Sequence, residues 1–130
     1  MESNGDCIYL KEAKMLRAAE IHEIRCGNLF APVKKSDDEF AEVLMSGKSG
    51  GTRVERIISH GHASPPGFWY DQSEWEFVAV VGGNAELGFE AGNIEMNPGD
   101  WVMIPAHVRH RVLRTSENPP CVWLAVFGNE

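Results

Sequence analysis

The sequence has few cysteines and no long apolar run, and both shortages narrow the classes of protein to which it can belong. Its three cysteines, Cys7, Cys26 and Cys121, are odd in number and include no CxxC pair. Such a set suits neither a disulfide framework nor a thiolate metal site, so we expect three reduced thiols. Residues 1–20 contain early acidic side chains and no apolar stretch long enough for a signal peptide or a membrane span. We therefore expect a soluble, cytoplasmic protein.

Positive charge is also in short supply. Lys and Arg number 12 against 19 Asp and Glu, which gives a formal net charge of −7. An acidic surface repels phosphate backbones and anionic lipid headgroups. The basic residues are scattered except in the segment 107–114, where polar and apolar positions begin to alternate as they do on a strand. We therefore expect no nucleic-acid and no membrane partner, and a small molecule is the expected ligand.

With 130 residues the sequence has room for one domain with one core.

The first part of the chain has helical features. Residues 12–24 are rich in helix formers but lack a clean apolar stripe, which predicts a helix or a frayed arm. Ser36 is a candidate N-cap with Glu39 three residues later, so a second short helix is predicted between Ser36 and Gly47.

From Thr52 onward the chain changes to short β-type runs separated by Gly, Pro and Asn. Short strands at this spacing, with no helix-length segment between them, predict an all-β antiparallel sandwich or barrel. We accordingly divide the chain into an N-terminal arm (1–27), partly helical or disordered, and a single barrel domain (28–130). The predicted strands lie within residues 52–62, 74–83, 84–90, 93–97, 100–104, 110–115 and 121–127.

One connection between predicted strands differs from the others because it is rich in aromatic residues. The segment 64–73 carries Phe68, Trp69 and Tyr70 in succession. Exposing all three rings would reduce solubility, so the connection is expected to fold over the mouth of the barrel.

Four residues at predicted strand ends form a candidate metal site. His60 and His62 are two apart and, in a strand, point to the same face. Glu76 opens the next strand, and His110 opens a later one. If these ends meet at one mouth of a barrel, three neutral imidazoles and one carboxylate converge there. That donor set suits one divalent transition metal ion, namely Zn, Mn, Fe, Ni or Cu.

These residues also resemble the two motifs of the cupin superfamily. The first motif is matched by the pair in His60–His62, then by Glu76, and by Gly83 seven residues further on. The second lies within residues 99–110, with a glycine, a proline and, five residues after the proline, a histidine. The resemblance covers about residues 52–127. It implies a small double-stranded β-helix barrel of the jelly-roll type, with the metal at its open end.

The sequence departs from the family pattern between the histidine pair and the glutamate. Thirteen residues, 63–75, intervene where the pattern has only a few. The insertion is either a longer loop or a sign that other residues bind the metal. Counting back from Glu76 at the family spacing places Asp71 at the second histidine position and Trp69 at the first, so Asp71, and after it Gln72, are alternative ligands.

The resemblance leaves two functional hypotheses open. The first is a small metal-dependent enzyme, of oxygenase or isomerase type, in which the aromatic connection forms a lid and Tyr70, His107 or Arg109 donates a hydrogen bond or a proton. His107, which occupies a position where the pattern has glycine, would line the mouth. The second is a non-catalytic module that binds a sugar or another small ligand. Small cupins are often dimers, and the apolar run 122–127 suits pairing across a two-fold axis, so a homodimer is plausible. A barrel serving only as a dimer scaffold is least favoured, since it leaves the histidines unexplained.

Overall fold

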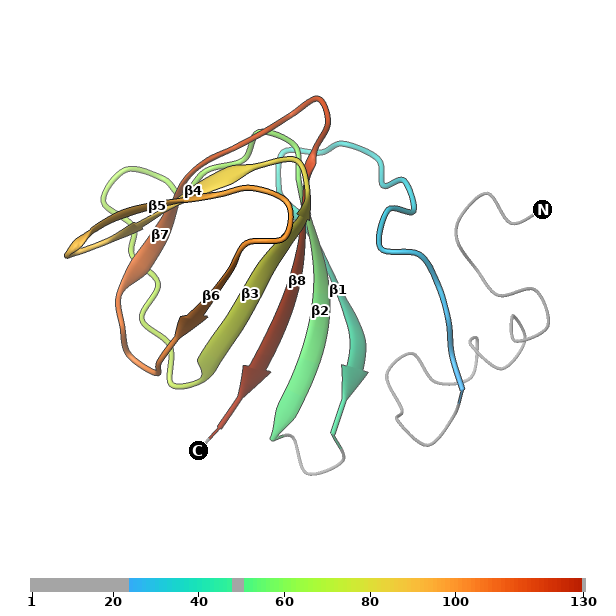
Figure 1. The fold of residues 1–130 in the computed structure, drawn as a ribbon, viewed down its shortest axis with the longest axis horizontal. Coiled ribbons are helices and arrows are strands. Elements are labelled where there is room, and N and C mark those ends of the chain that lie inside the picture. Colours follow the sequence, from blue (N-terminus) through green and yellow to red (C-terminus); the bar gives the residue numbers. More distant parts are fainter. Residues whose placement is uncertain (1–23, 48–50, 130) are drawn as a thin grey trace.

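The computed structural model describes residues 24–47 and 51–129, and this part of the chain consists of strands and their connections without a helix. This part of the chain therefore contains no helix that is long and apolar enough to cross a membrane. Figure 1 shows two sheets that face each other and diverge toward one end. The strands are β1 (Phe40–Ser46), β2 (Thr52–Ser59), β3 (Trp75–Gly82), β4 (Ala85–Phe89), β5 (Gly92–Met96), β6 (Trp101–Ile104), β7 (His110–Thr115) and β8 (Cys121–Gly128).

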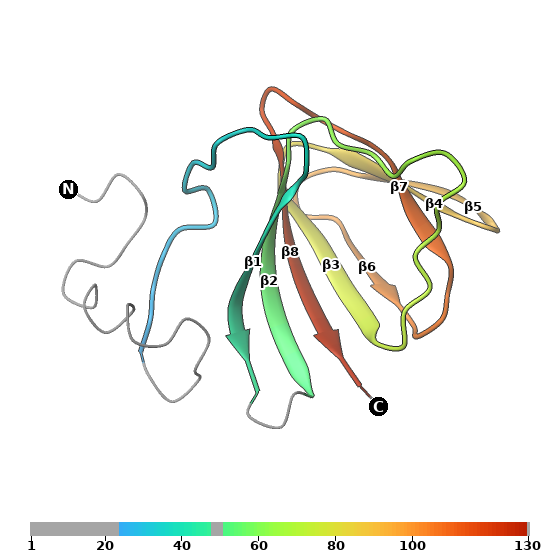
Figure 2. The same cartoon turned by 180° about the vertical axis from the view of Figure 1, so that it is seen from behind.

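Both sheets are antiparallel, as the short strands with no helix between them predict. The larger has the order β1-β2-β8-β3-β6 and the smaller the order β5-β4-β7. Strands β2 to β8 overlap the segments in which strands are predicted. In Figure 2 the two sheets lie close together where the chain crosses between them and diverge toward the other end. The structure therefore confirms an all-β jelly-roll barrel.

The helix predicted between Ser36 and Gly47 is wrong, because residues 40–46 form strand β1. The capping box does not form: Ser36 Oγ donates to Asp38 O, and the Glu39 carboxylate accepts from Ser59 Oγ instead. Pairing with β2 across the Gly-rich connection decides the conformation, since tertiary contacts override helix propensity. Residues 12–23 of the helix predicted for 12–24, and most of the 1–27 arm, lie outside the described residues, and Ile24 is not helical.

The core lies between the two sheets. Alternate residues of β3 and β8, such as Val78, Val80, Trp123 and Ala125, are almost completely buried there. They pack against Leu87, Met96 and Ile104 from β4, β5 and β6. The opposite parity of each strand faces outward. Outside the register shifts at Val43/Met45, Val80/Gly82 and Glu86/Leu87, inward or outward orientation follows from whether a residue number is odd or even within its strand.

The two cysteines among the described residues differ in state. Cys121 is a free, fully buried thiol at the start of β8, and burial together with the Glu39 carboxylate raises its pKa to about 12. Cys26, by contrast, is disulfide-bonded, so the expectation of reduced thiols is wrong at this position.

Gly83 turns the chain from one sheet to the other. Its φ is +69°, and a Cβ placed there would lie 2.4 Å from Pro120 O. Both the left-handed backbone and the close approach require glycine. This requirement gives the glycine of the first motif a structural role at the turn between β3 and β4.

Candidate functional site

A cavity of about 250 Å³ lies between the sheets at their open end. Strand parity explains its composition, because the inward positions of β2 contribute Arg53, Glu55 and Ile57 and those of β3 contribute Glu76 and Val78. Its floor is apolar and its rim polar. The other lining residues are Glu39, Ala41, Tyr70, Gln72, Leu87, Ile104, His110, Val112, Trp123 and Phe127.

Glu76 and His110 form an acid–base pair in the wall of this cavity. Glu76 Oε1 and His110 Nε2 are 3.5 Å apart, and the two side chains are only 12% and 5% exposed. His110 Nδ1 lies 2.9 Å from Val108 O, which can only accept, so Nδ1 carries a hydrogen. In the neutral ring Nε2 is then an unprotonated acceptor facing a carboxylate. A proton bound at Nε2 is shared with Glu76 at the cavity surface.

This geometry also sets the direction in which the pKa of His110 moves. Burial disfavours the imidazolium and lowers the pKa, but the hydrogen bond to Glu76, the bond to Val108 O and the charge of Glu76 outweigh burial. The pKa of His110 is therefore raised above its ordinary value of 6.5. The pair retains a proton near neutral pH more readily than an isolated histidine does.

Tyr70 completes one side of the pair. It forms an antiparallel bridge with His110, and its ring stacks on the imidazole at 5.3 Å between centroids. Phe89, the partner of His110 on β4, lies 6.1 Å away on the other side of the same strand. Burial, followed by the charges of Glu39 and Glu76, raises the pKa of the Tyr70 hydroxyl, which therefore stays protonated. The imidazole is thus fixed in orientation by an aromatic ring on each side.

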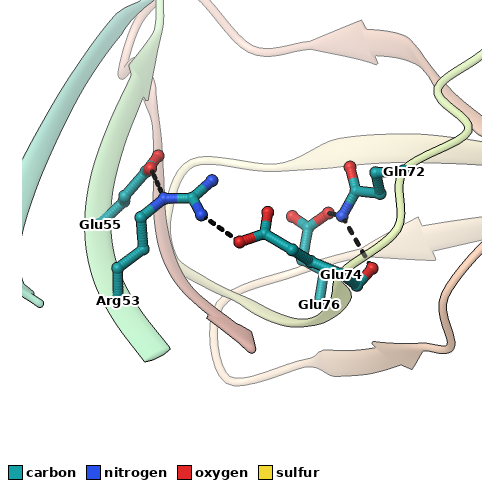
Figure 3. A network of polar contacts seen from close by, with 5 residues as sticks. All are labelled: Arg53, Glu55, Gln72, Glu74 and Glu76. Atoms are coloured by element: carbon teal, nitrogen blue, oxygen red, sulfur yellow. Dashed lines mark hydrogen bonds and ion pairs between the residues drawn. The ribbon is translucent and has the colours of Figure 1, made fainter. Parts of the chain in front are cut away.

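Figure 3 shows a polar network around Glu76, the carboxylate of the pair. Gln72 Nε2 donates to Glu76 Oε1 at 3.3 Å and to Glu74 O at 3.4 Å. Arg53 Nε donates to Glu55 Oε2 at 2.6 Å, and Arg53 Nη1 to Glu74 Oε2 at 2.5 Å. The glutamine holds the carboxylate of the pair, and the two other carboxylates hold the arginine.

The opposite wall is anchored by a buried serine. Ser59 is fully buried, donates to Glu39 Oε2 at 2.8 Å and accepts from Trp123 Nε1 at 3.1 Å. These bonds fix a further carboxylate at the cavity margin.

The aromatic connection is docked against β7 on the smaller sheet. Ser64 N donates to Val112 O, and Arg111 Nη2 donates to the carbonyls of Ser64 and Pro65. The Trp69 ring lies 5.1 Å from the Arg109 guanidinium and 6.0 Å from that of Arg111. Of the three aromatic residues, only Tyr70 lines the cavity. Arg109, a predicted catalytic residue, instead stacks on Trp69 and pairs with Glu90 outside the cavity.

His107 and Asp71, both predicted as site residues, meet each other at the rim. His107 Nδ1 lies 2.8 Å from Asp71 Oδ1, and both side chains are more than half exposed. His107 N also donates to Gln72 O at 2.7 Å, which ties two loops together. Its φ is +64°, which explains why the family pattern has glycine there. Neither side chain lines the cavity.

The structure does not bring His60 and His62 to Glu76 and His110. β2 ends at Ser59, which faces inward, so His60 faces the opposite side. There it borders a separate depression with Phe30 and Pro120. Gly61, with φ of +79°, then breaks the alternation on which the expected common face depends. The rings are 6.5 Å apart, and both belong to loop structure.

Both ring nitrogens of His62 are engaged by the backbone. Nδ1 accepts from His60 N at 2.9 Å, and Nε2 donates to Ser36 O at 2.9 Å. A histidine bonded in this way has no free nitrogen for a metal. Its role is to hold the segment before β1 against the end of β2.

The predicted donor set consequently does not fit a divalent metal ion. Transition-metal sites ordinarily use three or four His, Cys, Asp or Glu side chains. Within residues 24–47 and 51–129, no three such side chains gather in a way that could hold one. In the cavity only Glu76 and His110 are of this type and adjacent, with Gln72 and Tyr70 beside them.

Strand parity could have identified Tyr70 and Gln72 as cavity-lining residues. From the sequence, Tyr70 is predicted in the lid and Gln72 as an alternative metal ligand. Both share the parity of Glu76, and both line the cavity, whereas Asp71 between them faces the rim. Arg53, Glu55 and Glu39 were missed because an alternating strand gives no sign of which face lines a cavity until the sheets are assembled.

Two antiparallel sheets around a cavity, with polar side chains at its open end, define a jelly-roll binding barrel. Residues 55–127 match the model of the cupin domain, and the chain belongs to this family. A comparison with curated proteins gives no match.

Solved structures show the same fold. A protein of Ralstonia eutropha JMP134, described as a "putative mannose-6-phosphate isomerase", is 48% identical, with a TM-score of 0.75; the match covers 80% of this chain and 97% of that one. A cupin superfamily protein of Desulfitobacterium hafniense DCB-2 is 14% identical, with a TM-score of 0.65 and coverages of 78% and 87%. A conserved Streptococcus pyogenes protein of unknown function is also 14% identical, with a TM-score of 0.65 and coverages of 88% and 93%.

Proposed function

We propose that the chain is a small cupin enzyme that transfers protons on a polyhydroxylated carbonyl compound, with Glu76 and His110 as the catalytic residues. The observation that carries the proposal is the acid–base pair in the wall of a cavity. Glu76 Oε1 and His110 Nε2 are 3.5 Å apart, and both side chains are largely withdrawn from water. Reactive carboxylate–imidazole pairs of this kind are typical of general acid–base sites.

The pair has the two functions that an aldose–ketose isomerisation needs. The Glu76 carboxylate removes the proton from the carbon next to the carbonyl, and the released electron pair forms the carbon–carbon double bond of an enediol. His110 donates its Nε2 proton to the carbonyl oxygen. Glu76 then returns its proton to the neighbouring carbon, and His110 recovers a proton from the adjacent hydroxyl as the new carbonyl forms. Atoms and charge balance without an oxidant or reductant.

The surrounding residues suit this chemistry. Gln72 holds the Glu76 carboxylate, and the stacked Tyr70 ring fixes the imidazole plane. The protonated Tyr70 hydroxyl is a donor for a sugar hydroxyl or for the developing enediol oxygen. A cavity of about 250 Å³ lies toward the small end of the range for small-molecule sites.

The likeness to the Ralstonia protein supports an isomerase on a carbohydrate. That protein, 48% identical over most of this chain, is described as a "putative mannose-6-phosphate isomerase". An aldose–ketose isomerisation is the type of proton transfer that the Glu76–His110 pair can perform. The two lines of support are independent, because one is sequence identity and the other is side-chain geometry.

The proposal is tested by proton exchange, which detects the first step even where net conversion is slow. The protein is incubated with D-mannose or D-fructose in D₂O, and NMR follows deuterium incorporation at the carbon next to the carbonyl. We expect incorporation with the wild type and a loss of about 100-fold or more in Glu76→Gln, the usual size of a general base's contribution. Glu95→Gln, which removes an exposed carboxylate on β5, is the matched control and should exchange like the wild type.

Two further outcomes are informative. Exchange that persists in EDTA is expected, because the donor set does not fit a metal ion; exchange that requires added Zn, Mn, Fe, Ni or Cu would restore the predicted metal-dependent enzyme. Sugar binding without exchange in the wild type would overturn the enzymatic proposal in favour of a non-catalytic sugar-binding module.

A further inference from the structure

The charges around the cavity are arranged unfavourably for a phosphorylated ligand. Arg53 is the one Lys or Arg among the residues that line it. Recognition of a phosphate group ordinarily relies on cationic side chains with free donors, arginine above all. Whether the cavity can bind a sugar phosphate therefore depends on whether Arg53 is available.

Arg53 is held on three sides by the protein itself. Its Nε donates to Glu55 Oε2 at 2.6 Å and its Nη1 to Glu74 Oε2 at 2.5 Å. Its guanidinium carbon lies 4.1 Å from the centre of the Phe127 ring. Figure 3 shows the guanidinium between the two carboxylates. The guanidinium keeps free donors at Nη2, but Glu55 and Glu74 already offset its charge, and a phosphate bound there would lie beside both carboxylates.

The charge balance of the lining points the same way. Glu39, Glu55 and Glu76 line the cavity, against Arg53 and, when protonated, His110. Three carboxylates against at most two cations leave the lining negative in either state of His110. Negative charge at Glu39 and Glu76 also contributes, after burial, to the raised pKa of the Tyr70 hydroxyl.

A neighbouring depression extends this negative region. It has a volume of about 280 Å³, shares Glu39 and Tyr70 with the cavity, and adds Asp37 and Asp38. Neither Lys nor Arg is among the residues that line it. A longer ligand that extends from the cavity in this direction meets further acidic groups.

We propose that this cavity selects uncharged or cationic carbohydrates and rejects their phosphate esters, with Arg53, Glu55 and Glu74 as the residues that set this specificity. The inference rests on the proposed function and names its substrate class, an unphosphorylated sugar. This substrate class lacks the phosphate of mannose 6-phosphate, the compound named in the description of the 48% identical Ralstonia protein.

Calorimetric titration with three probes of equal ring size and different charge tests the inference. The probes are D-mannose, mannose 6-phosphate and D-mannosamine, which are neutral, dianionic and cationic near neutral pH. We expect mannose and mannosamine to bind at least about tenfold more tightly than the phosphate at low salt. Because the cause is electrostatic, the difference should narrow as ionic strength rises, whereas steric exclusion of the phosphate would not respond to salt.

Two variants with the same change in net charge test whether the contacts of Arg53 with Glu55 and Glu74 cause the weaker binding of the phosphate. Glu74→Gln releases one partner of Arg53, so the ratio of phosphate to mannose affinity should rise several-fold. Glu95→Gln makes the same change in net charge on exposed β5 and should leave the ratio unchanged.

Tighter binding of mannose 6-phosphate than of mannose by the wild type would overturn the inference while leaving the proton-transfer proposal in place. A preference for mannose that does not respond to salt or to Glu74→Gln would also overturn it, by showing that shape rather than charge excludes the phosphate. If none of the three probes binds, the proposed carbohydrate function itself fails, and the inference fails with it.

Discussion

At the residue scale, His110 combines a fixed orientation with an exchangeable proton. Its Nδ1 hydrogen is committed to Val108 O, and its Nε2 faces Glu76. Because the ring is bonded through Nδ1 and stacked by Tyr70, only Nε2 can take part in chemistry. The preference for the protonated form has a consequence for stability as well as for catalysis.

The raised pKa of His110 makes the folded protein lose stability as the solution becomes more alkaline. The folded state binds this proton more tightly than the unfolded state does. The resulting stabilisation is complete below the unfolded value of about 6.5 and is lost as pH rises through the higher folded value. Urea unfolding of the wild type between pH 6 and pH 9 should show this fall, and His110→Gln should remove its histidine component. A wild type and a variant with parallel pH profiles would contradict it.

His107 offers a test of backbone strain at the rim. A non-glycine residue at φ of +64° costs about 1 kcal/mol, and its exposed contact with Asp71 contributes little in return. We therefore expect His107→Gly to be about 1 kcal/mol more stable than His107→Ala. Both variants lose the imidazole, so their difference reports the backbone alone. Equal stabilities in thermal unfolding would show that the left-handed conformation is not the reason for glycine in the family pattern.

The candidate site shows what sequence can and cannot give at this scale. Glu76 and His110 could be found because both family spacing and strand parity identify them, and the structure places them side by side. His60 and His62 match the residue types of the motif, yet neither lines the cavity. His60 faces outward, and Gly61, with its left-handed backbone, turns the chain before His62. The spacing of residues along the sequence does not reveal such a change in side-chain orientation.

At the scale of the elements, the connection 64–73 runs along the β7 edge of the smaller sheet without forming a strand of its own. Tyr70 bridges to His110, and Ser64 N donates to Val112 O, so the connection runs beside β7. The sequence predicts that this connection folds over the mouth of the barrel, because its aromatic rings have to be shielded from water. That reasoning does not consider arginine side chains, which shield the Trp69 ring instead. Trp69 packs against Arg109 and Arg111 rather than over the opening.

Removing Arg111 should loosen this connection without disturbing the rest of the fold. Arg111 donates to two carbonyls, Ser64 O and Pro65 O, and lies against Trp69. We expect Arg111→Met to cost about 2 kcal/mol and to accelerate hydrogen exchange at the amides of Ser64 and Tyr70. Arg114→Met on the exposed face of β7 is the control. Unchanged protection of these amides in Arg111→Met would show that the connection is held by its backbone bonds alone.

Strand β1 shows why the N-terminal half is harder to predict. The segment 37–46 has the composition of a short helix, and its only decisive partner, β2, follows a Gly-rich connection. Local propensity could not anticipate the pairing. Strands β2 to β8, by contrast, alternate strongly enough that their positions follow from the sequence.

At the scale of the whole molecule, the sheet order bears on assembly. The run 122–127, suggested from the sequence as a strand that pairs across a two-fold axis, lies within β8, which already pairs with β2 and β3 on its two sides. A homodimer stays a prediction, and among the described strands the free edges of the larger sheet are β1 and β6. β6 exposes Trp101 and Met103, so we expect Trp101→Lys to shift sedimentation from dimer to monomer if β6 forms the interface. A wild type that sediments as a monomer at all concentrations would contradict the prediction.

The two sheets create an enclosed site that no single element contains. Glu76, His110, Tyr70 and Arg53 come from four separate segments, and only the closed barrel brings them around one cavity. The family and the all-β fold could therefore be predicted from the sequence, whereas the composition of the cavity could not.

The most direct test of this site compares two histidines in one assay. His110→Gln and His62→Gln are each measured for deuterium incorporation into D-mannose in D₂O, with EDTA present and folding checked by circular dichroism. We expect His110→Gln to lose about 100-fold or more and His62→Gln to keep the wild-type rate, because only His110 faces the cavity. Loss of exchange in His62→Gln with full activity in His110→Gln would contradict the proposal and return the chemistry to the histidine pair of the motif.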